Sequence, residues 1–151
     1  MTVRFTLRQA HAQERFELEA LQWRASLAND HDRGSLIAHP EAIDLPEAQI
    51  SAGQVTVADM DGKAVGFAVV LPRPDGDVEL DGLFVEPTLW KSGLGRALVQ
   101  ASEAFGRVKG ASSLHVVGNP HALGFYEACG FMPAGVQTTQ FGPGILLRLR
   151  L

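Results

Sequence analysis

An expected strand that leads into two glycines and a long amphipathic helix limits the folds open to this chain. Residues 78–85 alternate in a strand pattern, and Gly93 and Gly95 follow shortly afterwards. From Gly93 to about Val108, apolar residues recur at helical spacing and form one stripe: Leu94, Ala97, Leu98, Ala101, Phe105 and Val108. A strand followed by such a helix is typical of α/β proteins, in which the apolar face of the helix packs on a sheet.

Further strands are expected along the chain. The apolar runs 55–60 and 64–71 flank Asp61-Gly62, a dipeptide that predicts a two-residue hairpin turn. The same alternation predicts strands over residues 3–7, 114–117, 131–140 and 144–151, with Gly142-Pro143-Gly144 between the last two.

Helices are expected between these strands. One covers residues 12–28 with Phe16 on its apolar stripe, and the segment 29–34 is expected to break it. Less regular helical patterns follow over 35–53, interrupted by Pro40 and Pro46, and over 120–129. We therefore predict one α/β domain (α+β mixed) over residues 1–151, with a twisted mixed sheet of about seven strands flanked by about four helices.

The composition disfavours several classes of function. Of the 151 residues 46% are hydrophobic and 20% charged, as in a globular protein that buries a core. A formal charge of −4 argues against nucleic-acid binding, which requires a basic surface. We expect neither a signal peptide nor a membrane span, which would need roughly 18 apolar residues. Cys129 is the only cysteine, so we expect a reducing, cytoplasmic environment without disulfides.

The glycines at positions 93 and 95 predict a binding site for a phosphate group. The first N–H groups of a helix have no acceptor within the helix, and the helix dipole adds positive potential. Because glycine lacks a side chain, a phosphate can approach these amides closely. A P-loop would need glycine where Trp90 stands, and a dinucleotide fingerprint would need it at Leu98. A plain structural turn is the alternative interpretation.

Two segments of the chain resemble the signature segments of the GNAT (Gcn-related) N-acetyltransferases. In the first, Val85, Gly93 and Gly95 stand at family positions, whereas Trp90 replaces the usual Gln or Arg. In the second, six residues match the family pattern: Asn119, Ala122, Phe125, Tyr126, Gly130 and Phe131. The resemblance implies a GNAT-like twisted mixed sheet and the transfer of an acetyl group from acetyl-CoA to an amine.

The resemblance also implies a binding site for coenzyme A. Twelve residues are expected to contact it: Leu83, Phe84, Val85, Lys91, Ser92, Gly93, Leu94, Gly95, Arg96, Asn119, Phe125 and Tyr126. The family's asparagine holds the pantetheine arm, and its tyrosine meets the departing sulfur. The corresponding residues here also have structural interpretations, Asn119 as a helix N-cap before Pro120 and Tyr126 as core packing.

Two acids on the fourth strand are candidates for the general base. Acyl transfer needs a neutral amine, and a carboxylate can accept the proton of the ammonium form. Glu79 and Asp81 point to one face of a regular strand, and Glu79 is the first choice because several family members carry an acid at its position. Both could instead be ordinary solvated residues. Backbone N–H groups of Phe84 and Val85 could bind the thioester oxygen.

The acceptor is expected to bind near the end of the first helix. In the family this region shapes the acceptor pocket, and it corresponds here to Trp23, Arg24 and His31. The sequence leaves open whether the acceptor is a small-molecule amine, a peptide N-terminus or a lysine. It also leaves open whether the protein forms a homodimer. We expect no metal site, because the five histidines show no ligand spacing. A non-catalytic acyl-CoA sensor and a nucleotide-binding α/β module are the alternative functions.

Overall fold

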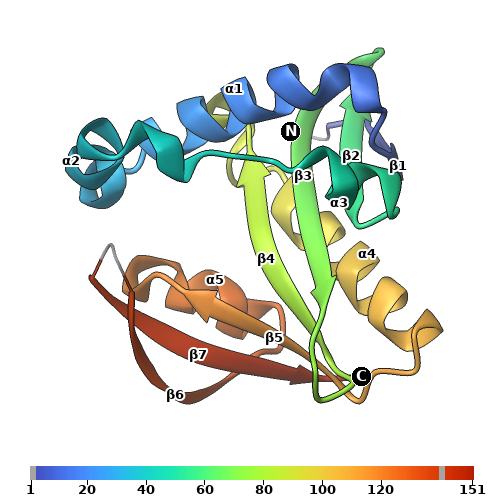
Figure 1. Ribbon diagram of the computed structural model, residues 1–151, viewed down its shortest axis with the longest axis vertical. Helices are drawn as coiled ribbons and strands as arrows, with labels where there is room; N and C mark the ends of the chain where they lie inside the picture. Colours follow the sequence, from blue (N-terminus) through green and yellow to red (C-terminus); the bar gives the residue numbers. More distant parts are fainter. Residues whose placement is uncertain (1–2, 140–141) are drawn as a thin grey trace. The chain divides into compact units, whose positions relative to one another are not determined.

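The fold is a mixed α/β arrangement built on a seven-stranded sheet with the strand order β1-β2-β3-β4-β5-β7-β6 (Figure 1). The computed structural model describes residues 3–139 and 142–151, with the side chain of His31 excepted. The strands are β1 (Thr6–Gln9), β2 (Val55–Met60), β3 (Lys63–Pro72), β4 (Val78–Val85), β5 (Ser113–Gly118), β6 (Met132–Thr139) and β7 (Gly142–Arg150). The pairing of β4 with β5 is parallel, whereas β5 with β7 and β6 with β7 are antiparallel. This confirms the predicted fold class.

Five α-helices lie within the described residues: α1 (Arg15–Leu27), α2 (Asp30–Ala38), α3 (Glu47–Ser51), α4 (Leu94–Val108) and α5 (Leu123–Ala128). Four short 3-10 helices accompany them, at Ala12–Glu14, Pro40–Ala42, Pro87–Leu89 and Pro120–Ala122. In the part of the chain that the structure describes, no helix has the length and apolar character needed to cross a bilayer.

The chain divides into two compact units, which are described separately. The first unit comprises Met1–Val69 and Gly82–Leu98, and the second comprises Val70–Asp81 and Val99–Leu151. The first unit therefore contains β1, β2, helices α1 to α3 and the start of α4. The second contains β5 to β7, α5 and the larger part of α4.

In the first unit, the β2–β3 hairpin forms as predicted. Met60 pairs with Lys63, and Asp61 and Gly62 both adopt left-handed backbone angles, with φ of 55° and 85°. These angles belong to the tight turn whose twist matches that of the flanking strands. Asp59 strengthens the turn, because its carboxylate accepts a hydrogen bond of 2.7 Å from the N–H of Gly62.

The core of the first unit joins α1 to these strands. Leu18 and Leu21 of α1 are almost fully buried, as are Val57 and Phe67. The Phe67 ring lies 5.2 Å from that of Phe84 at the far end of β4. Burying side chains of this size stabilises the fold by roughly 1.5–3 kcal/mol each, so this core holds the end of β4 firmly.

The second unit is built around the antiparallel ladder of β5 and β7. Ser113 pairs with Arg150 at one end, and Gly118 pairs with Ile145 at the other. The parallel ladder between β4 and β5 is short and joins Val78 with Leu114 and Glu79 with His115. The remaining residues of β4 lie beyond this ladder.

Some expected elements differ from the observed ones. Strand β1 begins at Thr6 rather than at Val3, and Gly142-Pro143-Gly144 opens β7 instead of lying between the last two strands. The chain was expected to be non-helical over 29–34, but only a short bend at Asn29 separates the two helices. Helix α2 starts at Asp30, and the Arg33 N–H donates to the carbonyl of Asn29. Acids in the first turn of α2 favour the helix through its dipole. The expected strand end at residue 140 lies outside the described residues.

Phe16 was expected on the buried stripe of the first helix, and this was wrong. Its side chain is 74% exposed, and the guanidinium of Arg15 lies over its ring at 5.5 Å from the centroid. Phe16 lies in α1 only two residues before the buried Leu18, and residues two apart point to opposite sides of an α-helix, which has about 3.6 residues per turn.

Candidate functional site

The glycine loop, defined here as residues 86–93, joins β4 to α4 in the first unit. Lys91 and Gly93 have left-handed backbone angles, with φ of 64° and 91°, and α4 begins at Leu94. A left-handed non-glycine residue costs roughly 1–2 kcal/mol, and such strain is concentrated at functional sites. A Cβ built on Gly93 meets nothing within 4 Å, so the backbone there is open to a ligand.

Hydrogen bonds within the glycine loop fix its shape. The indole N–H of Trp90 donates to the carbonyl of Val85 at 2.9 Å, which ties the loop to the end of β4. The hydroxyl of Ser92 donates to the carbonyl of Leu89, and the Leu89 N–H donates to the carbonyl of Glu86 at 2.8 Å. Trp90, which stands where the signature segment usually has Gln or Arg, therefore stabilises the loop through its indole N–H.

Two basic residues flank the expected phosphate site. Lys91 is exposed and has no hydrogen-bond or ion-pair partner among the described residues, so its ammonium group is available to an anion. Arg96 is exposed on the first turn of α4. Leu83, Phe84 and Val85 precede the loop at the end of β4, where all three are partly buried. The first unit thus contains nine of the twelve residues expected to contact coenzyme A.

The expected acceptor residues lie in the same unit. Trp23 and Arg24 are on the last turns of α1, and Trp23 is partly buried. Arg24 makes two hydrogen bonds to the carboxylate of Glu86, so its guanidinium is already engaged by the protein. His31 is on α2, and its side chain lies outside the described residues.

Tyr126 is held in the core of the second unit. Its side chain is 8% exposed, and its ring makes edge contacts with those of Phe125 and Phe131 at centroid distances of 5.2 and 5.4 Å. Burial raises the pKa of Tyr126 to about 12, so the phenol keeps its proton at neutral pH. Among the described residues its hydroxyl has no hydrogen-bond partner, yet its oxygen is not sealed from solvent. This hydroxyl can donate to a ligand.

Gly118 on β5 positions the Tyr126 ring, a contribution that the sequence did not reveal. A Cβ built on Gly118 would lie 3.2 Å from Cε2 of Tyr126 and 3.0 Å from Cδ1 of Leu147. These distances are shorter than ordinary contacts, so only glycine lets the ring pack this closely. The three residues come from β5, α5 and β7, and no single stretch of sequence contains them.

Asn119 starts the short helical segment that carries Tyr126. Its side-chain oxygen accepts a hydrogen bond of 3.0 Å from the N–H of His121, and Pro120 occupies the first helical position. The predicted N-cap is therefore confirmed. Phe125 is 38% exposed. At the other end, Gly130 ends the segment with a left-handed φ of 102°, as is common for a helix C-cap.

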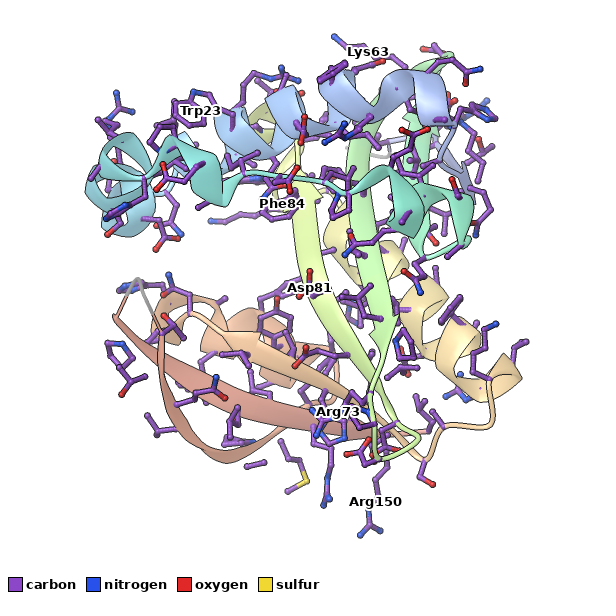
Figure 2. All side chains as sticks on the ribbon, viewed as in Figure 1. Trp23, Lys63, Arg73, Asp81, Phe84 and Arg150 are labelled. Carbon is purple, nitrogen blue, oxygen red and sulfur yellow. The ribbon has the colours of Figure 1, made fainter. Side chains whose placement is uncertain are left out.

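Glu79 and Asp81 lie on one face of β4, as predicted, since they alternate with the buried Val78 and Leu80. Figure 2 labels Asp81 on this strand. The carboxylate of Glu79 is 3.9 Å from a guanidinium nitrogen of Arg73. Asp81 is exposed and has no ion-pair or hydrogen-bond partner among the described residues. Its surroundings nevertheless desolvate the carboxyl, which raises the pKa of Asp81 above its usual value. Of the two acids, only Glu79 has a cation beside its carboxylate among the described residues.

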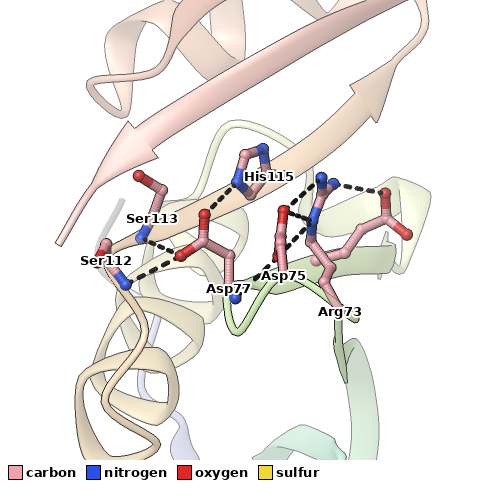
Figure 3. A network of polar contacts seen from close by, with 7 residues as sticks. Arg73, Asp75, Asp77, Ser112, Ser113 and His115 are labelled. Atoms are coloured by element: carbon pink, nitrogen blue, oxygen red, sulfur yellow. Dashed lines mark hydrogen bonds and ion pairs between the residues drawn. The ribbon is translucent and has the colours of Figure 1, made fainter.

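A polar network surrounds Asp77 at the start of β4 (Figure 3). One oxygen of Asp77 accepts hydrogen bonds from the N–H groups of Ser112 and Ser113, and the other lies 2.8 Å from Nε2 of His115. Ligand atoms of Asp75, Asp77 and His115 lie within 4.8 Å of one another, close enough together for one metal ion to contact all three. Arg73 already neutralises Asp75, however, and Asp77 joins β5 to the turn before β4. The network therefore has a structural explanation.

Comparisons with known proteins identify the fold and the family. The PaiA N-acetyltransferase from Thermoplasma acidophilum, solved in complex with coenzyme A, has a TM-score of 0.77 at 17% identity, and the match covers 99% of this chain and 100% of that one. A GCN5-related N-acetyltransferase from Rhodopseudomonas palustris has a TM-score of 0.78 at 20% identity, with coverage of 100% and 98%.

A third solved structure is similar along most of its length. The ribosomal-protein-S18-alanine N-acetyltransferase from Escherichia coli has a TM-score of 0.70 at 20% identity, with coverage of 97% of this chain and 94% of that one.

A search of curated proteins found no match. The model of the acetyltransferase (GNAT) family matches residues 12–131, which include the glycine loop and Tyr126. The chain therefore belongs to the GNAT acetyltransferase family.

Proposed function

We propose that this protein is an N-acetyltransferase, formed by one domain over residues 1–151, that transfers an acetyl group from acetyl-CoA directly to a primary amine. The observation that carries the proposal is the glycine loop, in which two left-handed residues precede the start of α4 and the backbone at Gly93 is open. Family membership and the coenzyme A bound to the PaiA relative support acetyl-CoA as the donor.

The loop suits the pyrophosphate of coenzyme A. The N–H groups of residues 92–96 belong to the loop end and the first turn of α4, where helix geometry leaves amide donors without acceptors. Lys91 adds a cation with no described partner in the protein. An anion bound here would also gain from the positive end of the helix dipole, typically by 0.3–1 kcal/mol.

Tyr126 is our candidate for the general acid. Acetyl-CoA supplies an activated acetyl thioester, and the sulfur needs a proton when its bond to the acetyl carbon breaks. The Tyr126 hydroxyl remains protonated because of its raised pKa, and it has no described partner that competes for its proton. Backbone N–H groups of Phe84 and Val85 are candidates for binding the thioester oxygen as it gains negative charge.

Asp81 is our first candidate for the general base, and Glu79 is the second. The sequence favoured Glu79, but Arg73 lies beside its carboxylate, whereas Asp81 has no described cation partner. Desolvation raises the pKa of Asp81, which makes its carboxylate a better proton acceptor. In this role the carboxylate takes the proton of the acceptor ammonium group, directly or through water, and leaves the amine nitrogen free to attack.

The acceptor could be a small-molecule amine, a peptide N-terminus or a lysine. The name of the Escherichia coli relative specifies a protein acceptor for that enzyme. For this chain we propose only a primary amine, because Trp23 and Arg24 define no acceptor chemistry and the Arg24 guanidinium is already paired.

An acetyl-transfer assay tests the proposal. Purified protein is incubated with acetyl-CoA and a panel of polyamines, aminoglycosides, amino acids and peptides, and product is measured by mass spectrometry alongside thiol release. An acetylated amine supports the proposal. Binding of coenzyme A without turnover on any amine would instead favour the acyl-CoA sensor. Thermal stabilisation by ATP or NAD, but not by coenzyme A, would indicate the nucleotide-binding module.

A further inference from the structure

An ion pair connects helix α1 to the first residue of the glycine loop. Nε of Arg24 donates to Oε1 of Glu86 at 3.0 Å, and Nη2 donates to Oε2 at 2.8 Å. This two-point contact fixes the orientation of both side chains, which a single point contact does not. The Glu86 side chain is 19% exposed and that of Arg24 is 44% exposed. The Arg24 hydrogen bonds lower the pKa of Glu86, which keeps the carboxylate ionised.

The backbone of Glu86 is fixed as well as its side chain. Its N–H donates to the carbonyl of Val65 on β3 at 2.9 Å, and its carbonyl accepts from the Leu89 N–H at 2.8 Å. Glu86 is therefore attached to β3, to α1 and to the 3-10 helix that follows it. The left-handed residues Lys91 and Gly93 follow these attachments along the loop.

We propose that Arg24 and Glu86 are positioning residues for coenzyme A. The pair anchors the start of the glycine loop, and the directions of the amides at its end depend on that anchor. Neither side chain needs to touch the cofactor. The inference rests on the proposed function, and it assigns to Arg24 a role in donor binding in place of the acceptor contact expected from the sequence.

Replacing Arg24 and replacing Glu86 should change the affinity for coenzyme A by different amounts, because the two changes leave different charges at the loop. Removing Arg24 leaves an unpaired carboxylate at the start of a loop that is proposed to bind an anion, whereas Glu86→Gln removes that charge. We expect Arg24→Met to raise the coenzyme A dissociation constant about fivefold, the upper range for an exposed pair with good geometry. Glu86→Gln should have a smaller effect. The double variant should bind no more weakly than Arg24→Met, because both changes break one contact.

The experiment is a calorimetric titration of coenzyme A into the wild type and these three variants, with thermal unfolding measured in parallel. Arg24→Lys is a milder fourth variant, which keeps the charge but loses the two-point geometry and should fall between wild type and Arg24→Met. Arg8→Met is the matched control, because Arg8 pairs with Glu14 and Asp59 in the same unit at 2.8 Å each. It should alter stability and leave coenzyme A affinity unchanged.

The outcomes separate this inference from the proposed function. A wild type that does not bind coenzyme A refutes the proposed function. A wild type that binds, with folded Arg24 and Glu86 variants within twofold of it, refutes the positioning role. Arg24→Met that raises the acceptor KM at unchanged coenzyme A affinity, with Glu86→Gln silent, also overturns it, because Arg24 would then contact the acceptor. An affinity loss in Arg8→Met equal to that in Arg24→Met would show a general stability effect instead.

Discussion

Replacing Tyr126 with phenylalanine should separate catalysis from packing. The change removes one hydroxyl that has no hydrogen-bond partner among the described residues, while the ring contacts with Phe125 and Phe131 remain. Because no protein hydrogen bond is lost, the free energy of unfolding should change by less than about 1 kcal/mol. If the hydroxyl protonates the leaving sulfur, kcat should fall roughly 10²-fold, or about 2.7 kcal/mol in the activation barrier.

The assay follows thiol release from acetyl-CoA with an active amine, and calorimetry measures coenzyme A affinity separately. Affinity should stay near that of the wild type, because the phenol acts on the sulfur only as the bond breaks. Since the pKa of Tyr126 is raised to about 12, its ionisation should not contribute to the pH–rate profile below about pH 10. A Tyr126→Phe variant that turns over at the wild-type rate would show that another group or water protonates the sulfur.

Three further changes test other parts of the structure. Asp81→Asn should slow acetylation and shift the pH–rate profile to alkaline pH more than Glu79→Gln does. A wild-type profile in both variants would exclude both acids as the base. Gly118→Ala should lower kcat several-fold and cost about 1–3 kcal/mol of stability, because the added methyl pushes on the Tyr126 ring; unchanged kinetics would contradict the positioning role. Asp77→Ala should lower Tm at pH 7, and the difference from wild type should shrink below about pH 4, where the carboxylate that His115 stabilises becomes protonated; a pH-independent difference would contradict this reasoning.

Local signals in the sequence predicted the elements whose cause is local. The Asp61-Gly62 turn and the cap formed by Asn119 and Pro120 depend on residues within one turn of each other, and both are observed. The same holds for the start of α4 directly after Gly93. A backbone conformation that favours one residue type, such as the left-handed conformation favoured by glycine, can be predicted from that residue alone.

Contacts between distant segments could not be predicted in this way. Arg24 and Glu86 are 62 positions apart, and Asp77 and His115 are 38 apart. Each is an ordinary polar residue within its own segment, so nothing nearby indicates a partner. For the same reason, no nearby signal indicated that Arg73 would lie beside the carboxylate of Glu79. Burial of the Tyr126 ring depends on Gly118, which also lies on another element.

Binding of coenzyme A by the glycine loop is the central claim, and a calorimetric titration of the wild type against Gly93→Val tests it most directly. Valine at this open, left-handed position both obstructs the approach to the amides and strains the backbone. Gly34→Val is the control, since its surroundings are also open and its φ is not left-handed. We predict that coenzyme A binds the wild type and the control alike, and that Gly93→Val weakens binding at least tenfold, about 1.4 kcal/mol. Equal affinity in a folded Gly93→Val protein would contradict the account.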